Sequence, residues 1–131
     1  MADLTRPGLP VVGPDQHLAD AARLMRHDRV GAVAVMVSGR LVGIITERDL
    51  MRAVADGVDS ERALTSERMT PEPRTIDHDE LATTAAERMI RLGVRHLPVV
   101  DDGVVVGVIS ARDLLNLGRP TPFEELAYEP W

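Results

Sequence analysis

The chain has 131 residues, of which 44% are hydrophobic and only 2% aromatic, so its core must be built from aliphatic side chains. Its net charge of −6 argues against a general nucleic-acid-binding protein, because such proteins need a cationic surface for the phosphates. Every basic residue is arginine and cysteine is absent, which excludes lysine Schiff-base chemistry, disulfides and Cys-ligated metal sites.

The first half of the chain alternates apolar runs with amphipathic segments. We predict an extended piece, an alanine-rich helix, two β-branched strands and a closing helix, at residues 9–12, 18–26, 32–37, 40–46 and 47–55. Asp15 is the predicted N-cap of the first helix, in which apolar residues recur at i, i+3, i+4 and i+7. Ser38-Gly39 between the two strands predicts a tight hairpin turn.

The same order recurs in the second half of the chain. At an offset of 64, residues 11–55 align with residues 75–119 without a gap, and 13 of the 45 pairs are identical. The second unit is predicted at residues 74–76, 81–92, 96–100, 104–110 and 111–117, with Asp79 as its helix N-cap and Asp102-Gly103 as its hairpin turn. Each unit is β-α-β-β-α, an α/β fold of the α+β type. Because a unit of this size can hardly bury both faces of its sheet, the two should pack around a pseudo-two-fold axis.

We therefore divide the chain into a first repeat (1–58), a linker with a short helical turn (59–73), a second repeat (74–118) and a tail (119–131). The tail holds all three aromatic residues, Phe123, Tyr128 and Trp131. Large aromatic side chains are common interface anchors, so we predict that the tail packs on the protein, on a partner chain, or on another protein. A frayed terminus is the alternative.

A motif joins each hairpin to the following helix at residues 43–49 and 107–113. It reads Gly, two aliphatic residues, a hydroxyl residue, any residue, Arg and Asp. A hydroxyl group at a helix start, an arginine and a carboxylate together suit a ribose 5′-phosphate, because the carboxylate can accept bonds from a vicinal diol. In the two copies these residues are Thr46, Arg48 and Asp49, and Ser110, Arg112 and Asp113.

The same residues also match capping boxes, in which the hydroxyl group accepts a bond from the N3 amide. The box prefers Glu or Gln where both copies have Asp, which argues against a cap alone. The two interpretations can coexist.

The two units resemble cystathionine-β-synthase (CBS) domains, and the tandem resembles a CBS pair, or Bateman module, over about residues 9–118. The resemblance rests on the Gly-h-h-Thr/Ser-x-x-Asp-Leu ending of both units, on GVRHLPVV at residues 93–100, and on Met69-Thr70-Pro71 before the second unit.

This resemblance implies a non-catalytic sensor that binds AMP, ADP, ATP, S-adenosylmethionine or NAD in clefts between the repeats, with no other cofactor. Asp49 and Asp113 would hold ribose hydroxyls, and Thr46 and Ser110 would bond phosphate. Residues 9–12 and 75–76 would flank adenine. The further ligand-binding residues that it implies are Arg29, Arg48, Ile76, Arg95, His96, Pro98 and Arg112. The Asp113 site ranks first, because Met-Thr-Pro and Leu97-Pro98 belong to the second unit.

The alternative function is a protein-interaction or structural module with empty or degenerate clefts, whereas no catalytic triad or metal-binding motif favours an enzyme.

The resemblance also implies a homodimer formed through the helices. We expect no nucleic-acid or membrane partner, and a cytoplasmic protein, because residues 1–8 include charges and no apolar run. His78, between Asp77 and Asp79, is interpreted as an exposed histidine at a helix start and not as a metal ligand, and His96 as a rim histidine that can touch a ligand.

Overall fold

The computed structural model describes residues 10–116 and confirms the order β-α-β-β-α in both repeats. The first repeat contains β1 (Val11–Val12), α1 (Leu18–Asp28), β2 (Ala32–Val37), β3 (Arg40–Thr46) and α2 (Glu47–Ala55). Two short elements follow, α3 (Thr65–Arg68) and β4 (Thr70–Pro71). The second repeat contains β5 (Ile76–Asp77), α4 (Ala82–Leu92), β6 (His96–Asp101), β7 (Val104–Ser110) and α5 (Ala111–Asn116).

Each repeat forms a small mixed sheet around its hairpin. The strand orders are β1-β2-β3-β4 and β5-β6-β7, with a parallel pair at β1–β2 and β5–β6 and antiparallel pairs elsewhere. Both predicted turns are confirmed: Ser38 and Gly39 have φ of 50° and 80°, and Asp102 and Gly103 have φ of 54° and 81°. Two consecutive positive φ values define the type I′ turn, which matches the twist of a hairpin.

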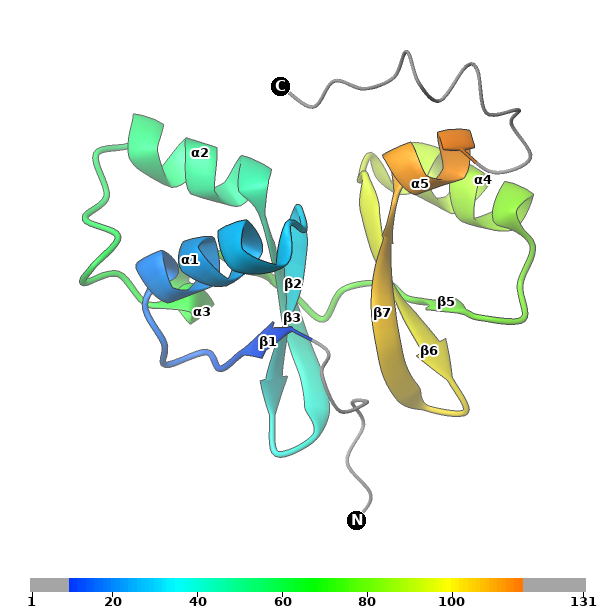
Figure 1. Cartoon of the computed structure of the whole chain (residues 1–131), viewed down its shortest axis with the longest axis horizontal. Helices are drawn as coiled ribbons and strands as arrows, with labels where there is room; N and C mark the ends of the chain where they lie inside the picture. Colours follow the sequence, from blue (N-terminus) through cyan, green and yellow to red (C-terminus); the bar gives the residue numbers. More distant parts are fainter. Residues whose placement is uncertain (1–9, 117–131) are drawn as a thin grey trace.

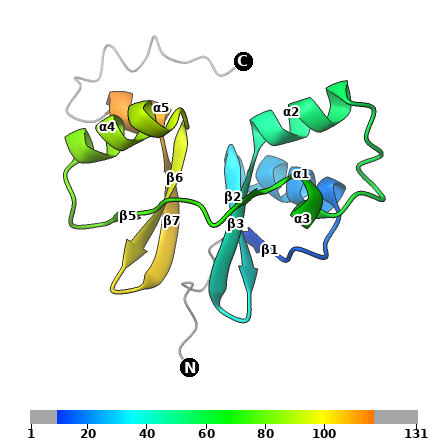
Figure 2. The same cartoon turned by 180° about the vertical axis from the view of Figure 1, so that it is seen from behind.

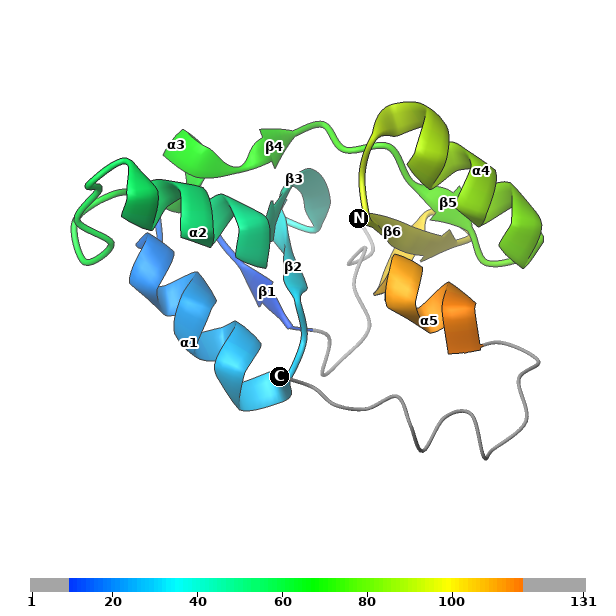
Figure 3. The ribbon, with the colours of Figure 1, turned by 90° about the horizontal axis from the view of Figure 1, so that it is seen from above.

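The two sheets face each other at the centre of the molecule, and the larger helices lie outside them (Figure 1). Seen from behind, α1 and α2 again cover one hairpin while α4 and α5 lie with the other (Figure 2). The view from above shows the linker crossing between the two halves along one edge (Figure 3). This arrangement is the predicted packing of two CBS-like repeats, and it creates a boundary at which both repeats contribute side chains.

Strand β2 is buried on both faces, which explains its unbroken apolar sequence. Val33 and Val35 face the helix side and join the core of the first repeat with Leu18 and Met25. Alternate residues point to the opposite face, where Ala34 and Met36 pack with Val105 of β7. The second repeat has its own core around Ile76, Ala85, Met89 and Leu97. Met25 and Met89 are therefore packing residues in the two cores.

The predicted N-caps, Asp15 and Asp79, are wrong, because the helices begin later, after His17 and Leu81. At the start of α1 the backbone N–H groups of Leu18 and Ala19 donate to carbonyl oxygens of Ala63 and Ser60, at 3.0 and 2.9 Å. In the second repeat, the Asp77 carboxylate accepts a hydrogen bond from the Asp79 N–H and forms a turn before α4. Contacts distant in the sequence thus replace the expected side-chain cap of α1.

The segment between the repeats packs on the first repeat. The predicted helical turn is α3, where the Thr65 hydroxyl group and N–H both donate to the Gln16 carbonyl oxygen, at 2.9 and 2.7 Å. Strand β4 then pairs with β3. A Cβ on Gly43 would collide with Met69 Sδ and lie 3.1 Å from the Thr70 carbonyl oxygen, so this close approach favours glycine.

No helix within residues 10–116 is long and apolar enough to cross a membrane. The predicted contacts of Phe123, Tyr128 and Trp131 lie outside the described residues.

Candidate ligand clefts between the repeats

Both hairpins end in a capping box, so the cap interpretation is confirmed in each repeat. The Thr46 N–H and hydroxyl group donate to Asp49 Oδ2, at 2.8 and 3.0 Å, and the Asp49 N–H donates to Thr46 Oγ1. In the second repeat the Ser110 N–H donates to Asp113 Oδ2 at 2.8 Å, and the Asp113 N–H donates to Ser110 Oγ at 3.1 Å. Aspartate therefore completes this box, and the sequence argument against a cap was wrong.

The capping boxes leave part of each carboxylate available. They use Oδ2 of Asp49 and of Asp113 and do not use Oδ1. The box fixes the orientation of the carboxylate at the start of a helix. A cap and a hydroxyl-binding site are thus compatible in the same four residues.

The first cavity, which we call the Asp113 cleft, has a volume of about 720 Å³. Its lining joins the two repeats: Arg29, Gly31 and Glu47 come from the first, and Ser110, Arg112 and Asp113 from the second. Pro10, Val30 and Val108 add apolar surface. This volume lies in the range of small-molecule sites.

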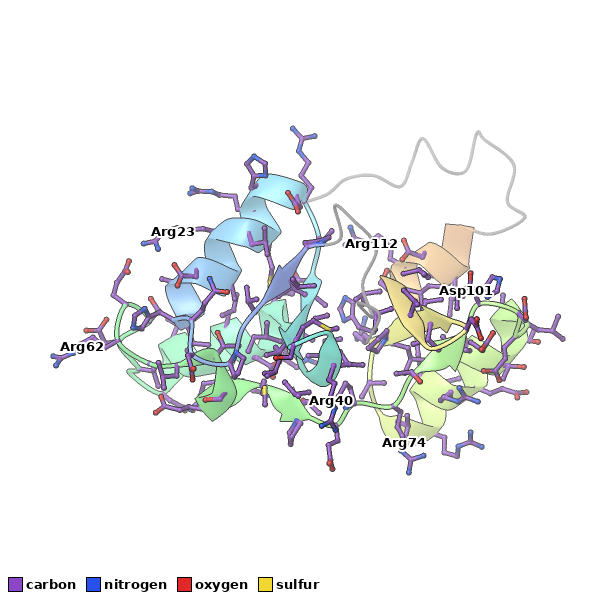
Figure 4. The ribbon with its side chains drawn as sticks, turned by 90° about the horizontal axis from the view of Figure 1, so that it is seen from below. Arg23, Arg40, Arg62, Arg74, Asp101 and Arg112 are labelled. Carbon is purple, nitrogen blue, oxygen red and sulfur yellow. The ribbon has the colours of Figure 1, made fainter. Side chains whose placement is uncertain are left out.

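The second cavity, the Asp49 cleft, has a volume of about 500 Å³. The end of β3 and α2 supply Thr46, Arg48 and Asp49, and the second repeat supplies the segment from Leu92 to Leu97. Four arginines line it, against three acidic residues: Arg48, Arg52, Arg74 and Arg95, and Glu47, Asp49 and Glu72. Figure 4 shows Arg74 of this cleft and Arg112 of the Asp113 cleft on opposite edges of the boundary between the repeats.

Three side chains line both clefts: Glu47, Arg95 and His96. Burial disfavours the charged form of His96 and lowers its pKa below the ordinary value of 6.5, although the Glu47 carboxylate opposes this shift. His96 is therefore largely neutral at pH 7 in the absence of a bound anion.

Nine of the eleven predicted site residues line a cleft: Arg29, Thr46, Arg48, Asp49, Arg95, His96, Ser110, Arg112 and Asp113. The structure does not bring the other two, Ile76 and Pro98, to either cavity. Ile76 is 4% exposed and packs in the core of the second repeat, and the side chain of Pro98 is fully buried.

Sequence reasoning missed Glu47, Arg52 and Arg74. Arg52 follows Arg48 by one helical turn, so the i, i+4 spacing already placed the two guanidinium groups on one face of α2. Glu47 occupied the variable position of the motif. Arg74 follows the linker, and only the path of that segment brings it to the cleft.

His78 lies outside both clefts, in the turn before α4. Its Nε2 is 3.1 Å from Asp79 Oδ1, and its Nδ1 is 3.3 Å from Asp101 Oδ1. Asp77, His78 and Asp79 each offer one ligand atom within 4.8 Å of the others, a spacing that is compatible with a metal ion but is also common among exposed acidic groups without one. The imidazole is 45% exposed and contacts these carboxylates directly, so we interpret it as an exposed histidine in ion pairs when protonated.

A family model described as "CBS domain" matches the chain twice, over residues 1–56 and 64–119. The CBS domain-containing protein YhcV of Bacillus subtilis is 35% identical over 104 residues, which cover 79% of this chain and 74% of YhcV. A 17.7 kDa protein of the bps2 3′ region of Acidianus ambivalens is 36% identical over 107 residues, covering 79% of this chain and 63% of that protein. Other curated relatives are longer, and the chain spans 34% of the length of two of them.

Solved structures show the same architecture. The CBS domain protein PAE2072 from Pyrobaculum aerophilum, complexed with AMP, superimposes with a TM-score of 0.76 and 30% sequence identity. The match covers 93% of this chain and 92% of PAE2072.

Proposed function

The chain belongs to the CBS-domain family and carries a pair of CBS repeats, and on that premise we propose that it is a regulatory module that binds an adenosine-containing ligand between the repeats. The observation that carries this proposal is the aspartate at the start of α2 and of α5, fixed by its capping box and leaving Oδ1 available in a cleft rich in arginine. The AMP complex of PAE2072 supports the proposal.

Each cleft offers the three kinds of contact that such a ligand needs. Asp49 or Asp113 accepts a hydrogen bond from a ribose hydroxyl. Guanidinium groups bind phosphate strongly because they present several donors in a planar fork. Apolar surface for adenine comes from Val30 and Val108 in one cleft and from Ile44 and Val94 in the other.

The test is a thermal-shift panel with AMP, ADP, ATP, S-adenosylmethionine and NAD. A ligand at a hundredfold excess over its Kd stabilises the folded state by about 2.7 kcal/mol, so we expect at least one to raise the Tm by several degrees. Asp113→Ala should remove most of this rise. If none of the five changes the Tm at millimolar concentration, the interaction-module alternative replaces this proposal.

Asp113→Ala also removes a capping bond, so the ligand-induced rise is measured from the Tm of each variant. Glu67→Ala is the matched control. The Glu67 carboxylate accepts a hydrogen bond from the Leu64 N–H at the start of α3, and it lines neither cleft. This variant should therefore lose the same kind of cap but keep the full ligand response.

The module is also proposed to act by binding without turnover, and as a homodimer. Helices α2 and α4 expose large apolar side chains, with Met51, Val54 and Ile90 at 59, 74 and 81% exposure. Exposed apolar surface of this kind often marks a protein interface. Sedimentation should give twice the chain mass of 14.3 kDa at micromolar concentration, and a mass of 14.3 kDa would contradict the dimer. Unchanged AMP, ATP and NAD after incubation, measured by chromatography, would support a non-catalytic role.

A further inference from the structure

The two repeats differ at three equivalent positions beside the clefts. Gly31, Ala32 and Glu47 of the first repeat correspond, at the offset of 64, to Arg95, His96 and Ala111 of the second. The backbone confirms this equivalence: the Glu47 N–H donates to the Gly31 carbonyl oxygen at 2.9 Å, and the Ala111 N–H donates to the Arg95 carbonyl oxygen at 2.8 Å. At each of these three positions, one repeat thus has a long side chain and the other repeat has a small one.

The glycine makes room for two of these long side chains. A Cβ on Gly31 would lie 3.0 Å from Glu47 Oε1 and 3.2 Å from His96 Nε2. The carboxylate and the imidazole therefore both pack against the backbone of Gly31. Because both side chains also line the Asp113 cleft and the Asp49 cleft, they stand between the two cavities.

We propose that Glu47 and His96 form a titratable wall shared by the two clefts, and that an anionic ligand on either side causes His96 to take up a proton. This inference rests on the proposed function, since it concerns the same two clefts. It adds a regulatory consequence: the clefts are coupled to pH and, through one ring, to each other.

The charges around His96 come from several elements. Glu47 and Asp113 favour the imidazolium form, and Arg48 and Arg95 oppose it; Arg29 and Arg112 also line the Asp113 cleft. Because these charges partly cancel, burial has the largest effect on the protonation of the ring, and the pKa of His96 in the free protein lies below its ordinary value. A phosphate in either cleft adds negative charge beside the ring and raises this pKa again.

Two consequences follow from that proton uptake. Anion binding becomes tighter as the pH falls through the range near the ordinary histidine value, because the bound state holds the extra proton. The positive charge acquired for one ligand also attracts an anion in the other cleft, so the first ligand assists the second. A rise of one pKa unit corresponds to a tenfold change in affinity, and we expect about threefold to tenfold.

The experiment measures the Kd of AMP and of ATP by calorimetry at pH 6 and pH 8, for the wild-type chain and for His96→Gln. Each phosphate has its own titration near pH 6, but this is common to both proteins and cancels in the ratio of their Kd values. The wild-type chain should gain affinity relative to His96→Gln by about threefold to tenfold between pH 8 and pH 6. His78→Gln, which changes a histidine outside both clefts, should behave like the wild type.

A second measurement tests the sharing of the wall and does not require the His96→Gln variant to fold. The pKa of His96 is followed by NMR, with and without saturating AMP, in Asp49→Ala and in Asp113→Ala, each of which retains one intact cleft. The pKa should rise on binding in both variants and fall in unliganded Glu47→Gln.

A rise in only one variant overturns the shared wall. The inference is also overturned if AMP or ATP binds but the ratio of the wild-type Kd to the His96→Gln Kd is the same at pH 6 and pH 8 and the His96 pKa does not change. That outcome leaves the proposed function intact. Absence of binding by AMP and by ATP to the wild-type chain overturns the inference, and it overturns the proposed function as well only if ADP, S-adenosylmethionine and NAD also leave the Tm unchanged.

Discussion

Gly43 and Gly107 occupy equivalent positions in the two repeats but have different surroundings, so they form a matched pair of substitutions. A Cβ at Gly43 would collide with Met69 Sδ and crowd the Thr70 carbonyl oxygen at 3.1 Å, whereas a Cβ at Gly107 would meet no described atom within 4 Å. Neither glycine has a positive φ. A Cβ therefore forces neighbouring atoms to shift only at the first site.

The expected magnitudes follow from two opposing effects. Overpacking costs about 1–3 kcal/mol, and alanine in a strand gains roughly 0.5–1 kcal/mol over glycine. Gly43→Ala should therefore lower the free energy of unfolding by about 1–2 kcal/mol, or the Tm by about 4–8 °C, while Gly107→Ala leaves it unchanged or raises it slightly.

Urea denaturation followed by circular dichroism measures both variants, and Met69→Ala tests the cause. The Gly43→Ala/Met69→Ala double variant should be less destabilised than the sum of the single changes by about 1 kcal/mol, because the side chain that causes the collision is gone. Equal losses in Gly43→Ala and Gly107→Ala would refute the assigned contact with the linker.

Three further predictions concern other contacts. Thr65→Val should lower the free energy of unfolding by about 1 kcal/mol, because it removes the buried hydrogen bond from the Thr65 hydroxyl group to Gln16. In the same urea denaturation, Thr70→Val at an exposed site should change it by less than about 0.5 kcal/mol. Burial lowers the pKa of His96, so its contribution to stability is complete above pH 6.5 and is lost as the pH falls toward the folded-state pKa; His96→Gln should flatten this slope in Tm measurements between pH 7 and 5. Arg52→Ala should weaken binding of ATP more than of AMP in calorimetry, because Arg52 is one of the four arginines of the Asp49 cleft; an equal loss for both would contradict this.

Local signals in the sequence were sufficient to predict the hairpins and several helix bounds. Strands β2, β3 and β7 and helix α2 begin and end at the predicted residues, because turn dipeptides and β-branched runs act over a few neighbouring positions. Helix α1 also begins at the predicted Leu18, but its cap could not be predicted in the same way. Its first N–H groups bond to the carbonyl oxygens of Ser60 and Ala63, some forty residues along the chain, and no local pattern encodes that contact.

Local sequence patterns also predicted only part of the candidate site. The motif residues reached the clefts because the capping box fixes them on the helix that follows each hairpin. Ile76 did not, because alternate residues of a strand face opposite sides, and its side chain faces the core of the second repeat. Arg74 and Glu47 reach a cleft only through the packing of one repeat on the other, which a pattern within one repeat cannot reveal.

The motif that the two repeats share and the three positions at which they differ have separate effects on the clefts. Two identical repeats would bring like side chains together where the clefts meet: two glutamates would repel each other, and two Arg-His pairs would compete for the space that Gly31 leaves open. A complementary carboxylate–imidazole wall needs one partner from each repeat and a small residue at the equivalent position of the other repeat. Gly31 and Ala32 occupy the positions equivalent to Arg95 and His96, and Ala111 occupies the position equivalent to Glu47, which meets this requirement. The repeated motif thus provides two clefts with the same carboxylate, whereas the three unlike positions give them one common titratable group.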